Sequence, residues 1–245
     1  MKSNGLGSLF FVDGYDISGD VASVDRISAS NTPFDVTAIN GSAHERIFGL
    51  NDGEMAFTHF FNDAAAQEHV VLKAKAAGAD RVVTYFKGSA IGNMAASLVA
   101  KQMNYDWSRN ADGSLMGQVQ CLANTTTLDY CEQLTAGKRT DASATNGASL
   151  DGGAATTIGL VAYIQVFALT SGSPTVKIQE SSDDAVGDPY ADVTGGTFGV
   201  VAANTAARIV TSLTLPVERY LRVVTTGTFS GLTFAVCASR YPVVS

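Results

Sequence analysis

The chain contains 245 residues, of which 46% are hydrophobic and 16% are charged, and its formal net charge at pH 7 is −7. This length suits one or two domains, and the apolar fraction is sufficient for a hydrophobic core. Sequence-independent binding of nucleic acid requires clustered Lys and Arg side chains that displace counterions. An acidic chain without a basic block therefore argues against a protein that grips DNA.

The amino terminus and the cysteines argue against a secreted, membrane-inserted, disulfide-rich or zinc-binding protein. Residues 1–8 are rich in Gly and Ser and do not resemble a signal peptide, and the apolar runs fall short of the ~20 residues that a membrane span needs. We therefore expect synthesis in the cytoplasm and no membrane insertion. Cys121, Cys131 and Cys237 are odd in number and have no C-x-x-C spacing. We expect three buried thiols rather than a disulfide framework or a zinc site.

The segment from Tyr15 to Asn62 has the clearest alternation of apolar and polar residues in the chain, and it contains almost no candidate catalytic residues. Apolar and polar residues are interleaved from Ile17 to Ile27, which predicts a half-buried strand. A polar loop is expected at 28–32, because it contains no apolar anchor. The run 34–37 then predicts a second, short strand.

A turn and a third strand follow. Ser42 precedes Glu45 by three residues, as in a capping box, so we expect one short helical turn that Gly49 closes. From Glu54 to Phe61 the apolar and polar residues alternate again, which predicts another half-buried strand.

The next segment predicts the one helix of the chain. Asn62 and Asp63 offer an N-cap for a helix over 64–77, and Gly78 closes it. Acidic residues lie near its start and lysines near its end, as the helix dipole favours. We expect this helix to pack on a sheet. The strands expected after it are 81–86, 93–108 and 115–124.

Composition changes after the first 137 residues. The sequence from Ala136 to Gly153 is dense in Ala, Gly, Ser, Thr and Asp, which predicts a linker, placed at 138–153. Short β-rich runs then recur through 154–245, so a separate antiparallel β-sandwich is expected there. The expected fold class is mainly β (α+β): a first domain at 1–137 with a barrel or sandwich and one packed helix, then the second sandwich.

Candidate chemical sites are weak. His44, His59 and His69 lie in different expected elements without metal-ligand spacing, and no Gly-x-Ser-x-Gly elbow or phosphate-binding loop occurs. The loop 181–192 holds four carboxylates but lacks the spacing of a calcium loop, so a solvated loop is the favoured interpretation. We expect no enzymatic activity, no catalytic or metal-binding residue and no cofactor.

The order "DISGDVASV…FDVTAI…HERIFGLNDGEMAFTHFFN" resembles the tube-forming major tail proteins of long-tailed bacteriophages. The resemblance covers roughly residues 10 to 135. It implies a structural virion protein of the tail, whose first domain forms stacked, hexameric rings that conduct the viral genome, while the second domain projects outward. It further implies contacts with other copies and with terminator, tape measure and distal tail proteins. Viral DNA would pass through without specific binding.

The resemblance also suggests roles for particular residues. Eight acidic side chains stand against three basic ones in residues 1–54, so an acidic lumen that repels phosphates is expected. The candidates for the lumen or for contacts between rings are Asp13, Asp16, Asp20, Asp25, Asp35, Asp52 and Glu54. The family's N-terminal arm reaches into adjacent subunits, and the corresponding apolar residues here are Leu6, Leu9, Phe10 and Phe11.

Two other functions stay open. The chain could be a carbohydrate-binding protein whose C-terminal sandwich recognises host-surface glycans, or a capsid-decorating or head-tail joining protein. Tubes formed by purified protein would favour the tail-tube interpretation over both alternatives.

Overall fold

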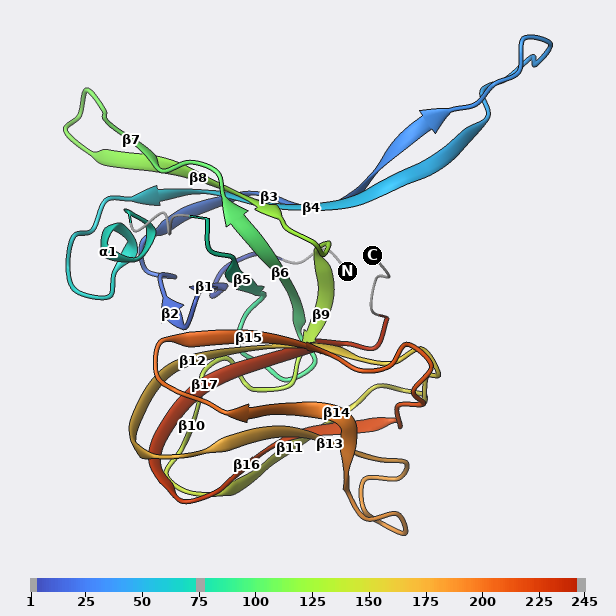
Figure 1. Ribbon diagram of the computed structural model, residues 1–245. Helices are drawn as coiled ribbons and strands as arrows, with labels where there is room; N and C mark the ends of the chain where they lie inside the picture. The colour runs from blue at the N-terminus through green and yellow to red at the C-terminus, as the bar shows by residue number, and fades with distance from the viewer. Residues whose placement is uncertain (1–3, 74–77, 242–245) are drawn as a thin grey trace.

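The computed structural model describes residues 4–73 and 78–241. The chain is mainly β, with two antiparallel sheets and one short helix, and the described part contains no closed barrel. Figure 1 shows two stacked halves, residues 4–133 above and residues 134–241 below, and a long hairpin that projects from the upper half. The expected fold class, mainly β with one packed helix, is confirmed.

The N-terminal half contains nine strands and the helix. Their bounds are β1 (Leu9–Val12), β2 (Tyr15–Asp16), β3 (Val21–Asp35), β4 (Arg46–Phe60), α1 (Glu68–Lys73), β5 (Arg81–Phe86), β6 (Met94–Gln102), β7 (Asp106–Arg109), β8 (Leu115–Ala123) and β9 (Asp129–Gln133).

Strands β3 and β4 form one antiparallel ladder of 15 residues each. The expected loop at 28–32 is wrong, because these residues pair along β4 and the ladder continues to Asp35 opposite Arg46. The helical turn expected after Ser42 is also absent, and residues 36–45 join the two strands instead, with a turn at 39–40 and a bend at 42–43. Gly49 lies inside β4, where a Cβ atom would approach the Thr32 carbonyl oxygen to 2.6 Å. Long-range pairing satisfies backbone groups that local sequence would have left to a loop.

The helix packs against the sheet, as expected. Val71 and Leu72 are buried in a cluster with residues of β1, β4, β5, β6 and β8. The helix begins at Glu68, whose amide donates to the carboxylate of Asp20 at 3.1 Å, so the anchoring carboxylate comes from a distant segment rather than from Asp63. Of the expected helix over 64–77, residues 74–77 lie outside the described part.

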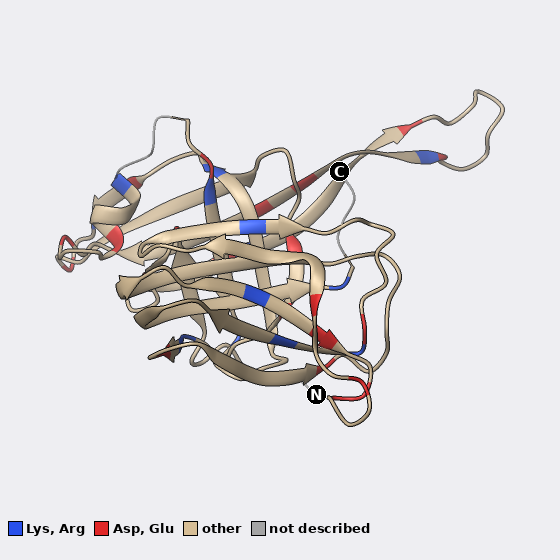
Figure 2. Cartoon of the chain, turned by 60° about the horizontal axis from the view of Figure 1, so that its bottom comes forward, with Lys and Arg blue, Asp and Glu red and all other residues tan. Residues whose placement is uncertain are grey.

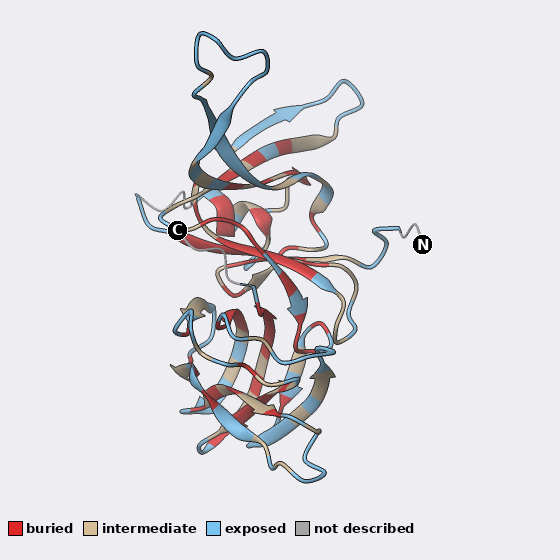
Figure 3. Ribbon diagram, turned by 90° about the vertical axis from the view of Figure 1, so that its right-hand side faces the viewer, coloured by how far each residue is buried: buried red, intermediate tan, exposed pale blue. Residues whose placement is uncertain are grey.

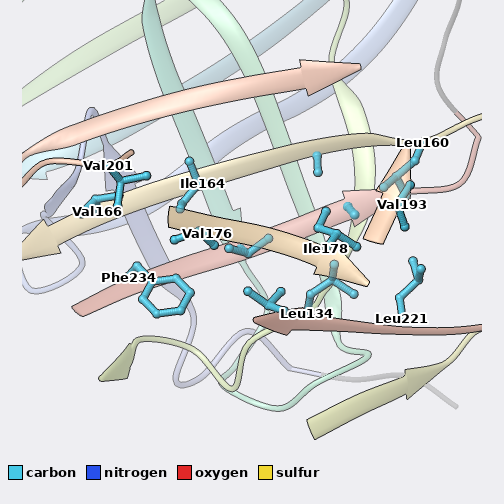
Figure 4. Packing of buried hydrophobic residues seen from close by; sticks show 14 of the residues in the cluster. Leu134, Leu160, Ile164, Val166, Val176, Ile178, Val193, Val201, Leu221 and Phe234 are labelled. Atoms are coloured by element: carbon cyan, nitrogen blue, oxygen red, sulfur yellow. The ribbon is translucent and has the colours of Figure 1, made fainter. Parts of the chain in front are cut away.

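The C-terminal half contains eight strands in two layers. Their bounds are β10 (Arg139–Asp141), β11 (Thr145–Asp151), β12 (Val161–Gly172), β13 (Thr175–Ser181), β14 (Ala191–Val200), β15 (Thr205–Val210), β16 (Tyr220–Thr226) and β17 (Phe229–Ser239). One layer is β11-β16-β13-β14, and the other contains β15-β12-β17 with β10. The core between the layers includes Ile164, Val176, Ile178 and Phe234, as Figure 4 shows.

The expected linker at 138–153 is not a free connection. Strand β10 pairs with β17, and strand β11 pairs with β16. The Arg139 guanidinium donates to both oxygens of Asp141 at 2.8 and 2.7 Å, and Thr225 donates to the same carboxylate at 2.7 Å. The few apolar residues in this segment suggested a linker, but polar side chains and backbone hydrogen bonds hold it in the fold.

The two halves share a continuous sheet. Strand β17 pairs with β9, so the large sheet runs from β15-β12-β17 into β9-β6-β5-β1. A buried apolar cluster lies between the halves and includes Phe11, Phe86, Cys131, Tyr163 and Cys237. Figure 3 shows buried strand segments passing through this junction. The division into two domains remains a prediction, but the halves are joined by sheet and core.

Candidate assembly surface

The projecting hairpin, residues 33–50, is here called the arm, and several of its large apolar side chains are exposed. Figures 1 and 3 show it extending far from the body with its surface open. Phe48 is 86% exposed, Leu50 is 83% exposed and Ile39 is fully exposed. The large apolar side chains that the arm exposes are Phe34, Val36, Ile39, Ile47, Phe48 and Leu50.

The arm is held in shape by its own ladder. Phe34 lies opposite Ile47, and Pro33 lies opposite Phe48, so the apolar side chains come together in cross-strand pairs. No second layer buries them, because the arm extends beyond the body. Successive pairs lie on opposite faces of the arm, so both faces expose apolar side chains. Clustered exposed apolar side chains indicate an interaction site in soluble proteins.

Polar contacts fix the outer end of the arm. Asp35 accepts hydrogen bonds from the Thr37 amide at 2.9 Å and faces Nδ1 of His44 at 2.8 Å. The Thr37 hydroxyl and amide, together with His44, hold the pKa of Asp35 below its usual value. This candidate lumen residue therefore stabilises the turn that presents the arm.

A polar sheet face adjoins the base of the arm. Asp25 accepts hydrogen bonds from Ser23 at 2.6 Å and from Thr58 at 2.7 Å. Glu54 accepts from Gln120 at 2.7 Å and pairs with Nε of Arg26 at 2.9 Å. Met55 and Phe57, the alternate residues of β4, are buried on the opposite face. These six residues, Ser23, Asp25, Arg26, Glu54, Thr58 and Gln120, are here called the polar face.

Three of the seven candidate acidic residues are bonded within the body of the chain, away from the arm and the polar face. Asp13 accepts from the Val82 amide at 2.9 Å and lies 3.8 Å from Nε of Arg81, yet burial raises its pKa above the usual value. Asp16 pairs with Lys138 across the junction of the halves. Asp20 is buried and accepts from Asn62 at 2.8 Å, besides anchoring the helix.

The acidic residues do not form one cluster. Asp25 and Glu54 lie on the polar face, Asp35 lies on the arm, and Asp52 is exposed where it accepts from the Gly53 amide at 2.7 Å. Figure 2 shows acidic residues dispersed over both halves rather than gathered in one patch. Among the seven candidates, Asp25, Asp52 and Glu54 share one open surface, because Asp52 and Glu54 alternate with buried residues along β4.

Of the four apolar residues expected to contact other subunits, some are exposed and some are buried in their own chain. Leu6 is 85% exposed and Leu9 is half-buried. Phe10 and Phe11 are buried inside their own chain, where Phe10 packs on Phe57 with ring centroids 4.6 Å apart. The intersubunit role expected for these two residues does not fit, because β1 is a core strand pairing with β5. Residues 1–3, at the start of the N-terminal segment expected to reach into adjacent subunits, lie outside the described part.

The described residues at the other candidate sites do not form a metal-binding or catalytic site. Across residues 4–73 and 78–241, no group of three His, Cys, Asp or Glu side chains could hold a metal ion. Within the same ranges, no helix is long and apolar enough to cross a membrane. In the loop 181–192, Asp183 accepts hydrogen bonds from the amides of Val186, Gly187 and Asp188. These bonds give the carboxylate a structural role. The three cysteines are free and buried, as expected.

The apolar surface of the arm was missed at the level of sequence. Its signal was present, because Ile39, Ile47, Phe48 and Leu50 stand in a segment otherwise rich in Gly, Asn and Asp. The pattern resembles that of a half-buried strand, and only the structure shows that the segment leaves the body.

Comparisons with known proteins give partial likenesses. No protein-family model and no curated protein matches the chain. Among solved structures, it is similar to a chain in the virion of a native gene transfer agent particle, at 14% identity and a TM-score of 0.41, over 53% of this chain and 98% of that one. It is also similar to the Dit protein of phage SPP1, at 10% identity and a TM-score of 0.32, over 95% and 98% of the two chains. A chain in the phage P2 baseplate gives 10% identity and a TM-score of 0.33, over 97% and 99%.

Proposed function

We propose that the chain is a structural subunit of a phage tail, and that copies of it join into stacked rings through the arm. One observation carries this proposal: a folded hairpin presents six large apolar side chains that its own chain leaves exposed. Burial of such a side chain contributes about 1.5 to 3 kcal/mol. A second copy of the chain is the partner, because the resemblance in the sequence is to proteins that assemble with themselves.

The polar face has a composition that suits a channel lining. It lies on the outer side of β3, β4 and β8, opposite the apolar face that packs on the helix. Six copies in a ring would direct this face inward, so that Asp25 and Glu54 repel passing phosphates and Arg26 remains paired with Glu54. The C-terminal half would then project outward. Terminator, tape measure and distal tail proteins would contact the ends of the assembly.

The proposal is tested by removing the apolar character of the arm. We expect purified wild-type protein to form rings or tubes in negative-stain images and in sedimentation velocity. The double substitution Phe48→Ser and Leu50→Ser should leave the protein monomeric with an unchanged thermal midpoint, since both side chains are exposed. The matched control is Val186→Ser, which alters a side chain that is 87% exposed on a loop of the other half. This control should assemble like the wild type.

Two outcomes would contradict the proposal. Wild-type protein that stays monomeric at every concentration would favour a carbohydrate-binding or capsid-decorating protein. Tubes that form equally well with the doubly substituted arm would show that copies join through another surface.

A further inference from the structure

The arm carries two neighbouring apolar side chains on one side of β4. Phe48 and Leu50 are separated by Gly49, so their side chains point to the same side of the strand. Both are almost fully exposed. The Phe34 ring lies against the other side, where a Cβ atom on Gly49 would approach it to 2.5 Å. Phe48 and Leu50 therefore form a two-pronged apolar surface, which is here called the plug.

An unpaired positive charge lies beside the plug. Arg46 precedes Phe48 by two residues, so it shares the same side of β4, and it is exposed. Asp35 lies opposite Arg46 in the ladder, but its carboxylate is occupied by Thr37 and His44. Within residues 4–73 and 78–241, no acidic side chain forms an ion pair with Arg46. The plug and this guanidinium together are apolar and positively charged.

A groove of about 300 Å³ lies at the opposite end of the same sheet. It is lined by the cross-strand row Thr58, Gln118 and Asp106, and by the neighbouring pair Met116 and Ser108. Residues directly opposite each other share one face of a sheet, so the groove opens on the side of the polar face, which includes Thr58. These five residues are here called the end groove. Figure 1 shows the arm and the β7–β8 hairpin at opposite ends of this sheet.

The end groove offers an apolar contact and a negative charge. Met116 is half-buried and lies opposite Phe60, which is 47% exposed. Asp106 is exposed, and its carboxylate accepts a hydrogen bond from Asn104 at 2.7 Å. Among the described residues, Asp106 has no basic partner, and it is the charged member of the lining. Apolar side chains beside a carboxylate complement the plug, which lies beside a guanidinium.

We propose that the end groove receives the plug of a second copy of the chain. The plug packs on Phe60 and Met116, and Arg46 of that copy pairs with Asp106. The arm of one chain points away from its own groove, so the two surfaces meet only between copies. Because these surfaces differ, the contact is head-to-tail, and every copy keeps a further arm and a further groove for the next contact. This inference rests on the proposed function, since it names the surface that the arm binds.

The test reverses the two charges in the full chain, alone and together. Arg46→Glu and Asp106→Arg should each raise the protein concentration needed for assembly about tenfold or more, because like charges then meet at every contact. Both side chains are exposed, so the thermal midpoints should stay close to that of the wild type. The double variant Arg46→Glu/Asp106→Arg should assemble again, since its charges are exchanged. Sedimentation velocity and negative-stain images give the readout.

A mixture of the two single variants separates contacts between copies from effects within one chain. Each variant alone should stay monomeric at a concentration where the wild type assembles. Every contact between the two variants is complementary, so an equimolar mixture should assemble. Arg109→Glu is the control, because Arg109 is an exposed cation of β7 that alternates with the groove residues and lies outside the lining. This control should assemble like the wild type.

Three results would overturn the inference. They are wild-type assembly by Asp106→Arg, a double variant or an equimolar mixture that stays monomeric, and an equal loss of assembly in Arg109→Glu. If Asp106→Arg assembles normally while the Phe48→Ser and Leu50→Ser variant does not, the arm binds another surface and the proposed function stands. Wild-type protein that stays monomeric would refute both.

Discussion

Asp13 illustrates how one residue can cost stability although it has good partners. Its carboxylate accepts a backbone hydrogen bond and lies near Arg81, and both effects favour the charged form. Burial opposes them and is the largest effect, so the pKa of Asp13 is raised above its usual value of 3.8. The folded state therefore binds this proton more tightly than the unfolded state does. Stability from this group is present below the unfolded pKa and is lost as the pH rises through the folded pKa.

We predict that Asp13→Asn changes the pH dependence of stability. The free energy of unfolding of the variant, relative to the wild type, should rise with pH between about 3 and 7, because asparagine has no proton to lose. Urea unfolding across this range measures it. Asp151→Asn is the control of opposite sign, since Arg219 lowers the pKa of Asp151 to about 2 and the wild type loses that stability as the pH falls. Equal slopes for both variants would contradict the prediction.

Strand β4 passes from the exposed arm into the buried core of the N-terminal half. Its second part buries Met55, Phe57 and His59, whereas its first part runs out into the arm. The change occurs near Gly53, where the strand passes the segment 127–128. A Cβ atom on Gly53 would lie 2.4 Å from the amide nitrogen of Leu128, and Thr127 donates to the Asp52 carbonyl at 2.8 Å. A side chain at this position would push the two segments apart.

We predict that Gly53→Ala destabilises the fold by about 1 to 3 kcal/mol, the usual cost of overpacking against backbone. Gly19→Ala is the matched control, because its Cβ atom would meet nothing within 4 Å and its φ is not positive. Chemical denaturation of both variants gives the comparison. If both substitutions cost the same, the close approach at Gly53 is not a constraint on β4.

At the scale of the whole molecule, a buried polar network joins the halves. The Tyr163 hydroxyl donates to Asp129 at 2.5 Å, and Nε of Arg208 donates to the Tyr163 oxygen at 2.9 Å. Burial raises the pKa of Tyr163, which keeps the phenol protonated. Beside this network, Gln165 accepts from the Gly14 amide at 2.6 Å and donates to the Val82 carbonyl at 3.0 Å. These bonds, with the β9–β17 pairing, link the two halves directly.

We predict a single unfolding transition, which Tyr163→Phe shifts to lower temperature. Loss of this hydroxyl removes a partner from the buried Asp129, at a cost of about 1 to 3 kcal/mol. Tyr85→Phe is the control, because its hydroxyl bonds to Ser8 at 2.8 Å in a partly exposed place. Calorimetry distinguishes the outcomes, and two separate transitions would show that the halves fold independently.

Limited proteolysis should spare residues 139–151, since this segment is paired into both sheets of the C-terminal half.

The sequence by itself determined the features that depend on local periodicity. The alternation of Met55 and Phe57 with polar neighbours placed a half-buried strand, and the short β-rich runs after residue 154 placed most strands of the C-terminal half. The helix was also located, although its anchoring carboxylate, Asp20, comes from a distant segment. Side-chain period and capping chemistry act within a few residues, so they can be recognised without knowing the fold.

Only the tertiary structure decided which of these elements are covered. Phe10 and Phe48 are both aromatic residues in strands, yet Phe10 is 2% exposed and Phe48 is 86% exposed. Residues 138–153 have the composition of a linker, yet two of its segments pair with β16 and β17. Burial and pairing depend on strands far away in the chain, and neither composition nor period specifies where those strands lie. The arm, the polar face and the end groove each arise from such long-range pairing.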